Sequence, residues 1–419
     1  MSELSYLEKL MDGVEVEWKT LEDITLRTSN IKWREAIRSY RYIDLTSVDI
    51  ATKKIIETTE ITKNNAPSRA QKLVDENDVI FATTRPTQQR FCLIDSEYAG
   101  AVASTGYCIL RAKKDQVLPK WILHWISTSD FKKHVEENQS GSAYPAISDS
   151  KVKECLIPIP CPDNPEKSLA IQSEIVRILD KFTALTAELT AELTAELNMR
   201  KKQYNYYRDQ LLSFDEEQEK PIYLEKLLDG VEVEWKTLGS IAELKRGTSI
   251  TKKDVIDGTI PVVAGGRTPA YYHNTSNRDG QTIVIAGSGA YAGFVSWWEE
   301  PIFVSDAFTV KPHNILLPRY CYHFLMNMQQ QLHEFKSGGG VPHVYPRDVS
   351  PILIPIPCPD NPEKSLAIQS EIVRILDKFD TLTNSITEGL PREIELRQKQ
   401  YEYYRDLLFS FPKPETVSN

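Results

Sequence analysis

The feature that most constrains this chain is an internal duplication. Residues 6–21 read YLEKLMDGVEVEWKTL, and residues 223–238 read YLEKLLDGVEVEWKTL, with one difference in 16 positions. The segment LIPIPCPDNPEKSLAIQSEIVRILDKF at 156–182 recurs unchanged at 353–379. Each copy therefore has a lead-in, a dissimilar block and a repeated segment in the same order, and the fold must use one structural unit twice.

We call the repeated segments the frame, and the dissimilar segments the first block (about 22–155) and the second block (about 239–352). The blocks share a pattern of short apolar strands, polar loops and amphipathic helices, which predicts one α/β fold used twice with different surface residues. The equivalent pairs are 77–82 with 281–286, 118–121 with 317–320, 140–141 with 337–338, and Pro145 with Pro342. The alternative is that duplication left two copies of one function. Neutral drift, however, would not be expected to keep the frame sequence unchanged while changing only the blocks.

The frame predicts a long helix after the first block. Asn164 suits the N-cap and Pro165 the first helical position. The unit TAEL, rich in strong helix formers, then occurs three times in 186–197. Nothing breaks the pattern before Ser213, so we expect a helix of roughly 48 residues, or about 70 Å.

The second copy predicts an interrupted helix. Its spacer at 380–396 has the same length as the corresponding segment of the first copy. It contains Gly389 and Pro391, however, which disfavour a continuous helix. Two long apolar-striped helices in one chain favour an antiparallel coiled-coil pair, with the two α/β blocks related by a pseudo-two-fold axis. Separate packing of each helix against its own block is the alternative.

Composition sets further limits. The chain is 41% hydrophobic and 26% charged, as in ordinary globular proteins, and no apolar run is long enough for a membrane span. The start lacks a secretory signal, and six scattered Cys indicate reduced thiols, so we expect a cytoplasmic protein. The net charge of −9 disfavours a freestanding DNA binder, unless partner subunits supply phosphate contacts.

Signatures of catalysis are absent from the sequence. There is no Asn/Asp-Pro-Pro-aromatic tetrapeptide, which marks amino-methyltransferases, and no G-x-x-x-x-G-K-[ST] phosphate-binding loop. His, Cys and Asp residues show no metal-ligand spacing. We therefore expect a chain with no catalytic residues, no metal and no cofactor of its own.

The ordered duplication resembles the specificity subunits of type I restriction-modification systems, and the IC family among them. The resemblance is carried by the two PIPCPDNPEKSLAIQSEIVRILDKF segments, the TAEL run, and the paired tails QYNYYRDQLLSF and QYEYYRDLLFSF. It covers essentially the whole chain. It implies two target recognition domains, each reading one half of a split site in double-stranded DNA. The expected divisions are a first recognition domain, a helical spacer, a second recognition domain and a C-terminal helical region, at 1–157, 158–220, 221–354 and 355–419.

The resemblance also implies partners. The helices would act as a ruler and as the docking surface for two modification (methyltransferase) subunits, which restriction subunits join to form a nuclease. S-adenosylmethionine, ATP and Mg are expected on those partners. Each TAEL adds about 6 Å and about 40° of rotation, so one unit corresponds to about one to two base pairs of DNA. The spacer residues are Thr186, Leu189, Thr190, Leu193, Thr194 and Leu197. Alternatively, the TAEL units simply favour helix formation and have no role in spacing.

Candidate DNA contacts in the first block cluster on a loop that follows an apolar strand. Arg and Gln side chains suit the edges of G and A respectively. The loop candidates are Thr84, Arg85, Thr87, Gln88, Gln89 and Arg90. Ser142 and Tyr144 lie on a second candidate loop, and the cluster Lys32, Arg34, Arg38 and Arg41 suits phosphates.

The equivalent loop of the second block begins with Gly287 and contains Ser288 and Tyr291. It resembles a glycine-rich phosphate loop, but strand rather than helix is expected after it, so we reject that reading. Its glycines would instead let the backbone approach DNA closely. Further candidates are Arg246, Lys252, Lys253, Arg267, Tyr271, His273, Lys336, His343, Tyr345 and Arg347.

Two other functions remain open from the sequence. One is a coiled-coil protein-protein scaffold without DNA readout, which the acidic charge favours mildly. The other is a self-contained DNA-modifying enzyme, which the missing motifs disfavour.

Overall fold

A computed structural model describes residues 13–214, 226–338, 340–385 and 387–413. Packing divides the chain into two compact units: unit 1 is 1–191 with 395–419, and unit 2 is 192–394. Each unit combines one block with parts of the helical frame, whereas the four divisions expected from sequence separate blocks from helices. The blocks and the frame are therefore packed together within each unit.

The two ends of each frame copy meet in a two-stranded antiparallel sheet. One strand comes from the lead-in and the other from the proline-rich segment after the block. These strands are β1 (Val16–Thr20) with β10 (Leu156–Pro160), and β11 (Val233–Thr237) with β19 (Leu353–Pro357). The earlier parts of the lead-ins, residues 6–12 and 223–225, lie outside the described residues. Each block thus leaves and re-enters the frame at one small sheet.

Unit 1 contains two four-stranded sheets, in the orders β2-β9-β6-β7 and β4-β3-β8-β5. Apart from the parallel pair β3–β8, the neighbouring strands are antiparallel. The strands are β2 (Thr25–Leu26), β3 (Tyr40–Ile43), β4 (Thr59–Ile61), β5 (Ala70–Leu73), β6 (Val79–Ala82), β7 (Phe91–Leu93), β8 (Val102–Ser104) and β9 (Tyr107–Ala112). The helices are α2 (Leu21–Ile24), α3 (Pro119–Trp125), α4 (Ser129–Asn138) and α5 (Asp149–Lys153), with short 3-10 turns η1 (Leu45–Ser47), η2 (Pro86–Gln88) and η3 (Ser96–Tyr98).

Unit 2 repeats this arrangement with the sheets β12-β18-β15-β16 and β14-β13-β17, in which β13–β17 is the parallel pair. The strands are β12 (Ala242–Arg246), β13 (Ile260–Val263), β14 (Tyr271–His273), β15 (Thr282–Ala286), β16 (Val295–Trp298), β17 (Phe303–Val304) and β18 (Ala307–Pro312). The helices are α8 (Leu238–Ile241), α9 (Pro318–Asn327), α10 (Gln329–Glu334) and α11 (Pro346–Val349). The strand order and the place of the parallel pair match unit 1, except that the described residues of unit 2 include no counterpart of β5. One α/β fold is therefore used twice, as predicted from sequence.

The long helix α6 (Pro165–Ser213) runs without interruption through the TAEL units. At its start the Asn164 side chain accepts a hydrogen bond from the Lys167 amide over 3.0 Å, which confirms the predicted cap. The second copy is broken into α12 (Pro362–Asn384) and α13 (Gly389–Leu408), as Gly389 and Pro391 predicted.

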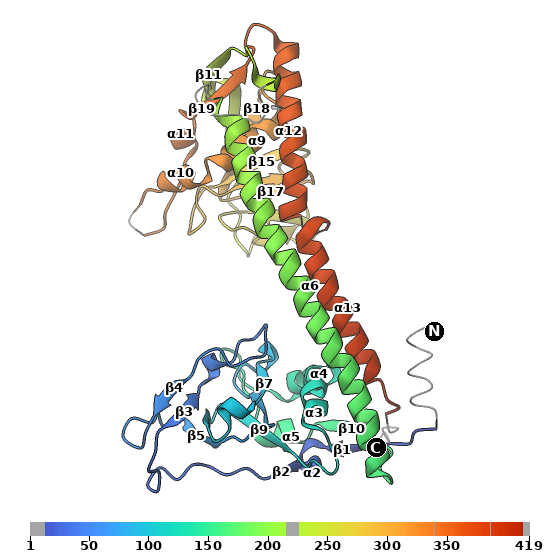
Figure 1. The fold of residues 1–419 in the computed structure, drawn as a ribbon. Helices are drawn as coiled ribbons and strands as arrows, with labels where there is room; N and C mark the ends of the chain where they lie inside the picture. The colour runs from blue at the N-terminus through green and yellow to red at the C-terminus, as the bar shows by residue number, and fades with distance from the viewer. Residues whose placement is uncertain (1–12, 215–225, 339, 386, 414–419) are drawn as a thin grey trace. The chain divides into compact units, whose positions relative to one another are not determined.

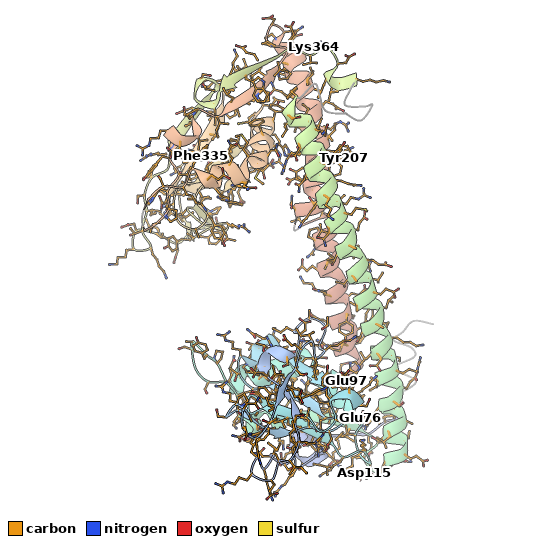
Figure 2. All side chains as sticks on the ribbon, turned by 60° about the vertical axis from the view of Figure 1, so that its left-hand side comes forward. Glu76, Glu97, Asp115, Tyr207, Phe335 and Lys364 are labelled. Atoms are coloured by element: carbon orange, nitrogen blue, oxygen red, sulfur yellow. The ribbon has the colours of Figure 1, made fainter. Side chains whose placement is uncertain are left out.

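Within each unit two frame helices lie antiparallel (Figure 1). In unit 1, Thr183 of α6 donates to the Tyr401 hydroxyl of α13 over 2.9 Å, while Ile175, earlier on α6, shares a core with Leu408. In unit 2 the Tyr207 ring stacks on Phe379 of α12, with centroids 5.4 Å apart (Tyr207 is labelled in Figure 2). Aromatic and apolar contacts therefore hold each helix pair together, as expected for a coiled coil.

All six cysteines are free, and Cys92, Cys108, Cys155 and Cys321 are buried. Burial raises the pKa of Cys92 and of Cys108 to about 12, which keeps both as thiols near neutral pH. In the part of the chain that the structure describes, no helix is long and apolar enough to cross a membrane.

Candidate nucleic-acid interface

The predicted recognition loop of unit 1 is fixed to a second loop by backbone hydrogen bonds. The Arg85 amide donates to the Pro145 carbonyl over 2.7 Å. The Ile147 amide donates to the Thr83 carbonyl over 2.9 Å. We call residues 83–90 with 139–147 the first loop pair. Its backbone bonds turn two loops that are distant in sequence into one surface.

Arg85 lies at the exposed face of the first loop pair. Its backbone is left-handed, with φ 49°, and the guanidinium carbon lies 5.0 Å from the ring centroid of Tyr144. Tyr144 is 71% exposed, and Gln88 and Ser142 are exposed as well. Because a guanidinium keeps its in-plane donors when it lies over a ring, Arg85 remains able to donate to a base edge.

Other residues of this loop face their own domain. The Arg90 guanidinium donates to the Leu45 carbonyl, and the Lys53 ammonium donates to the Gln89 carbonyl. Burial lowers the pKa of Lys53 to about 8. Thr84, Thr87 and Gln89 are half-buried. Arg90 and Gln89, both candidates from sequence, are thus tied into the base of the loop.

The corresponding loops of unit 2 are joined in the same way. The Gly289 amide donates to the Pro342 carbonyl over 2.9 Å, and the Val344 amide donates to the Gly287 carbonyl over 3.0 Å. A further two-way bridge joins Ser337 with His343, as Ser140 and Ala146 are joined in unit 1. We call residues 287–294 with 336–338 and 340–344 the second loop pair.

The side chains around the second loop pair differ from those of the first. The Arg267 guanidinium lies 4.9 Å from the Tyr291 ring. Tyr345 has Arg246 at 5.4 Å and Arg347 at 4.7 Å from its ring, and the His343 ring is nearly parallel to it at 5.7 Å. The structure thus brings six of the candidates together into two cation-aromatic groups. The three arginines and Tyr291 are exposed, whereas His343 and Tyr345 are half-buried.

Three other candidates of unit 2 form hydrogen bonds with residues of their own domain. Ser288 is buried and donates to the Asp306 carboxylate, and Lys336 donates to the Ala290 carbonyl over 2.8 Å. His273 is buried and accepts from the Ile256 amide over 3.1 Å. Tyr271 is half-buried in β14, whereas Lys252 and Lys253 are exposed.

The glycines of this loop differ in their surroundings. A Cβ on Gly293 would lie 2.6 Å from the Leu332 carbonyl oxygen, and φ there is +84°, so the fold itself requires this glycine. Gly289 also has positive φ, but a Cβ there would meet nothing within 4 Å. Of these two, Gly289 is therefore the one with open space beside its backbone. Strand β16 follows the loop, which agrees with rejecting a phosphate loop.

The basic cluster of unit 1 is partly neutralised. Arg41 pairs with Glu97 at 2.5 Å (Glu97 is labelled in Figure 2), and Lys32 lies 3.5 Å from Glu35. Arg38 lies over the Tyr40 ring at 4.5 Å, and Arg34 is exposed. Arg34 and Arg38 are thus the members best placed for phosphate contact.

Two residues that sequence reasoning missed support the loop pairs. Lys53 holds the first pair through Gln89, and Asp306 holds the second through Ser288. Neither has a local sequence signal, because each meets its partner through the tertiary fold. Among the described residues, no cluster of three or more His, Cys, Asp or Glu could hold a metal ion.

Comparison with known proteins gives one consistent result. The family described as type I restriction modification DNA specificity domain matches residues 14–199 and 230–396. The specificity subunit of the type I restriction enzyme EcoR124I/EcoR124II from Escherichia coli is 42% identical over 100% of both chains. The EcoprrI specificity subunit, also from E. coli, is 36% identical over 93% of both.

Solved structures share the fold. One, described as the structural basis of complex assembly and conformational transition of the type I R-M system, has a TM-score of 0.66 at 21% identity, covering 94% of this chain and 97% of that one. The HsdS subunit of Thermoanaerobacter tengcongensis has a TM-score of 0.51 at 20% identity, covering 94% and 96%.

Proposed function

Because this chain belongs to the type I restriction-modification DNA specificity family, a family of non-catalytic DNA-recognition subunits, we propose that its two α/β domains read different halves of one split DNA site. The first loop pair reads one half and the second loop pair reads the other. The helices set the distance between the halves.

One observation carries this proposal. The two loop pairs have the same backbone bonds, with Arg85 and Gly289 donating at equivalent positions, but they present different side chains. A shared scaffold with exchanged surface groups is what two readers of different sequences require, because base edges are distinguished by side-chain donors and acceptors.

The proposal includes partners. The frame helices dock two methyltransferase subunits, and restriction subunits join them. S-adenosylmethionine, ATP and Mg belong to those partners, in keeping with a chain that reads and positions rather than reacts. Partner subunits would also contribute phosphate contacts, which accounts for a reader with net charge −9. We place the assembly in the cytoplasm, where reduced thiols persist.

DNA binding tests the proposal. The chain assembled with its modification subunit is expected to select a split sequence from random DNA, about 10³-fold or more above scrambled DNA. Affinity should fall steeply between about 50 and 200 mM salt for both DNAs, because phosphate contacts release counterions. Titration by fluorescence anisotropy measures both quantities. Equal affinity for every DNA sequence would instead favour the protein-protein scaffold.

A further inference from the structure

Each unit contains a polar joint between its block and its frame helix. The frame contributes four positions, which recur 197 residues later. They are Pro158, Ser168, Gln172 and Asp180 in unit 1, and Pro355, Ser365, Gln369 and Asp377 in unit 2. Gln172 and Gln369 are both 0% exposed, which is unusual for glutamine, so their hydrogen bonds must be satisfied inside the protein.

The glutamine of each joint binds the backbone of the block. Gln172 Oε1 accepts from the Leu118 amide over 2.9 Å, and its Nε2 donates to the Gln116 carbonyl over 3.0 Å. In unit 2, Gln369 makes the same two bonds to Leu317 and Ile315, over 2.8 and 3.0 Å.

The bond to the leucine amide also caps a helix of each block, α3 in unit 1 and α9 in unit 2. Leu118 and Leu317 are the N-caps of α3 and α9, and neither side chain can cap its own helix. A side chain of the frame thus supplies the missing acceptor for the amide at each helix start. The serine at each joint lies 3.1 or 3.2 Å from the glutamine Nε2 and orients it.

The aspartate of each joint accepts hydrogen bonds from the side-chain nitrogens of two block residues. Asp180 accepts from His124 Nε2 over 2.9 Å and from Lys120 over 2.5 Å. Asp377 accepts from His323 Nε2 over 2.7 Å and from Arg319 over 2.7 Å. Burial alone would raise the pKa of each aspartate, but these hydrogen bonds outweigh it and hold the pKa below its ordinary value.

An aromatic side chain completes the joint from the block side. The Trp121 indole donates to the Pro158 carbonyl over 3.0 Å, and the Tyr320 hydroxyl donates to the Pro355 carbonyl over 3.1 Å. These partners are 37 residues apart in unit 1 and 35 in unit 2. The geometry is therefore kept although the intervening chain differs in length.

The block residues whose side chains take part in the joint follow one short sequence pattern. In both units it reads Leu-Pro-[Lys/Arg]-[Trp/Tyr]-x-x-His, at 118–124 and 317–323. The remaining contacts use backbone atoms, which any sequence provides. The blocks thus differ elsewhere but keep the groups that the frame binds.

We propose that this joint fixes the rotation of each recognition domain on its frame helix, so that Gln172, Asp180, Gln369 and Asp377 are positioning residues for DNA readout. Apolar burial has no preferred direction, whereas hydrogen bonds restrict the angle between their partners. Any block with the short pattern can be seated in the same orientation. This inference rests on the proposed reading of split DNA.

The test measures methylation by the assembled modification complex on DNAs whose half-sites are separated by gaps of different length. The native complex is expected to prefer one gap. Gln172→Leu removes both bonds to the block, and the preference over gaps one base pair longer or shorter should drop about tenfold, with half-site sequences unchanged. Gln369→Leu should lower the gap preference in the same way. Asp180→Asn, which keeps the side-chain shape, provides a second, gentler variant.

Two controls separate positioning from loss of stability. Lys120→Arg copies the residue found in unit 2 and should leave the gap preference intact. Val135→Ala opens the core of the same domain on α4, a helix that contributes no residue to the joint, and should lower total methylation without widening the accepted gaps. Native gap preference in Gln172→Leu and Asp180→Asn overturns the positioning role. Failure of the native complex to prefer any split site overturns the proposed function instead.

Discussion

Removing Thr190, Ala191, Glu192 and Leu193 from α6 is expected to shorten the gap in the methylated DNA site by about one to two base pairs. Both half-site sequences should stay the same, because neither loop pair is altered. The reason is geometric: four residues contribute about 6 Å of rise and about 40° of net rotation to a continuous helix. Sequencing of the methylated sites gives the gap directly.

The structure favours this outcome. The TAEL units lie within one continuous helix, so α6 has no existing break that would absorb a lost unit. The partner segment already breaks between Asn384 and Gly389, which leaves it able to adjust to a shortened neighbour. Inserting a fourth TAEL should lengthen the gap by the same amount.

A substitution that keeps the length provides the control. Thr190→Ala preserves the helix and should leave the gap unchanged, since Ala is the best helix former. If the four-residue deletion yields the original gap with normal methylation, the helix does not act as a ruler.

The second large effect concerns Arg85. Arg85→Ala should weaken recognition of one half-site by about 1–3 kcal/mol, and leave recognition of the other half unchanged. The exposed guanidinium over Tyr144 is the group of the first loop pair best suited to two parallel bonds with guanine. Binding to DNAs with single base changes in each half measures the effect.

Arg85→Lys separates base reading from phosphate contact. Lysine keeps the charge but cannot form the planar two-bond contact, so discrimination should be lost while salt-dependent binding remains. Arg267→Ala is the matched change beside the second loop pair and should affect the other half-site. A uniform loss on all DNA sequences after Arg85→Ala would reassign Arg85 to the phosphates.

Local signals in the sequence were sufficient for the frame helices and for the correspondence of the loops. Asn164, Pro165 and the helix-forming TAEL run predicted α6, and Gly389 with Pro391 predicted the break. These predictions were correct because N-caps, helix propensities and helix-breaking residues act within a few residues of one another in the sequence.

Features that depend on tertiary contacts escaped sequence reasoning. The pairing of β1 with β10 was missed because β10 alternates with prolines, which usually disfavour strands, but here the strand lies in a two-stranded sheet. His124 and His323 had no local signal, since their partners Asp180 and Asp377 lie more than 50 residues away. The inward orientation of Arg90 likewise depends on the carbonyl of Leu45.

The two blocks are expected to read different halves of one DNA site. Mapping of methylated bases across the genome of cells that express this chain with its modification subunit tests it most directly, alongside a chimera whose residues 239–352 come from another member of the family. We predict a two-part motif for the native chain, and a chimera motif in which one half changes while the other half and the gap remain. An uninterrupted motif, or a change in both halves, would show that the two blocks do not read separate halves.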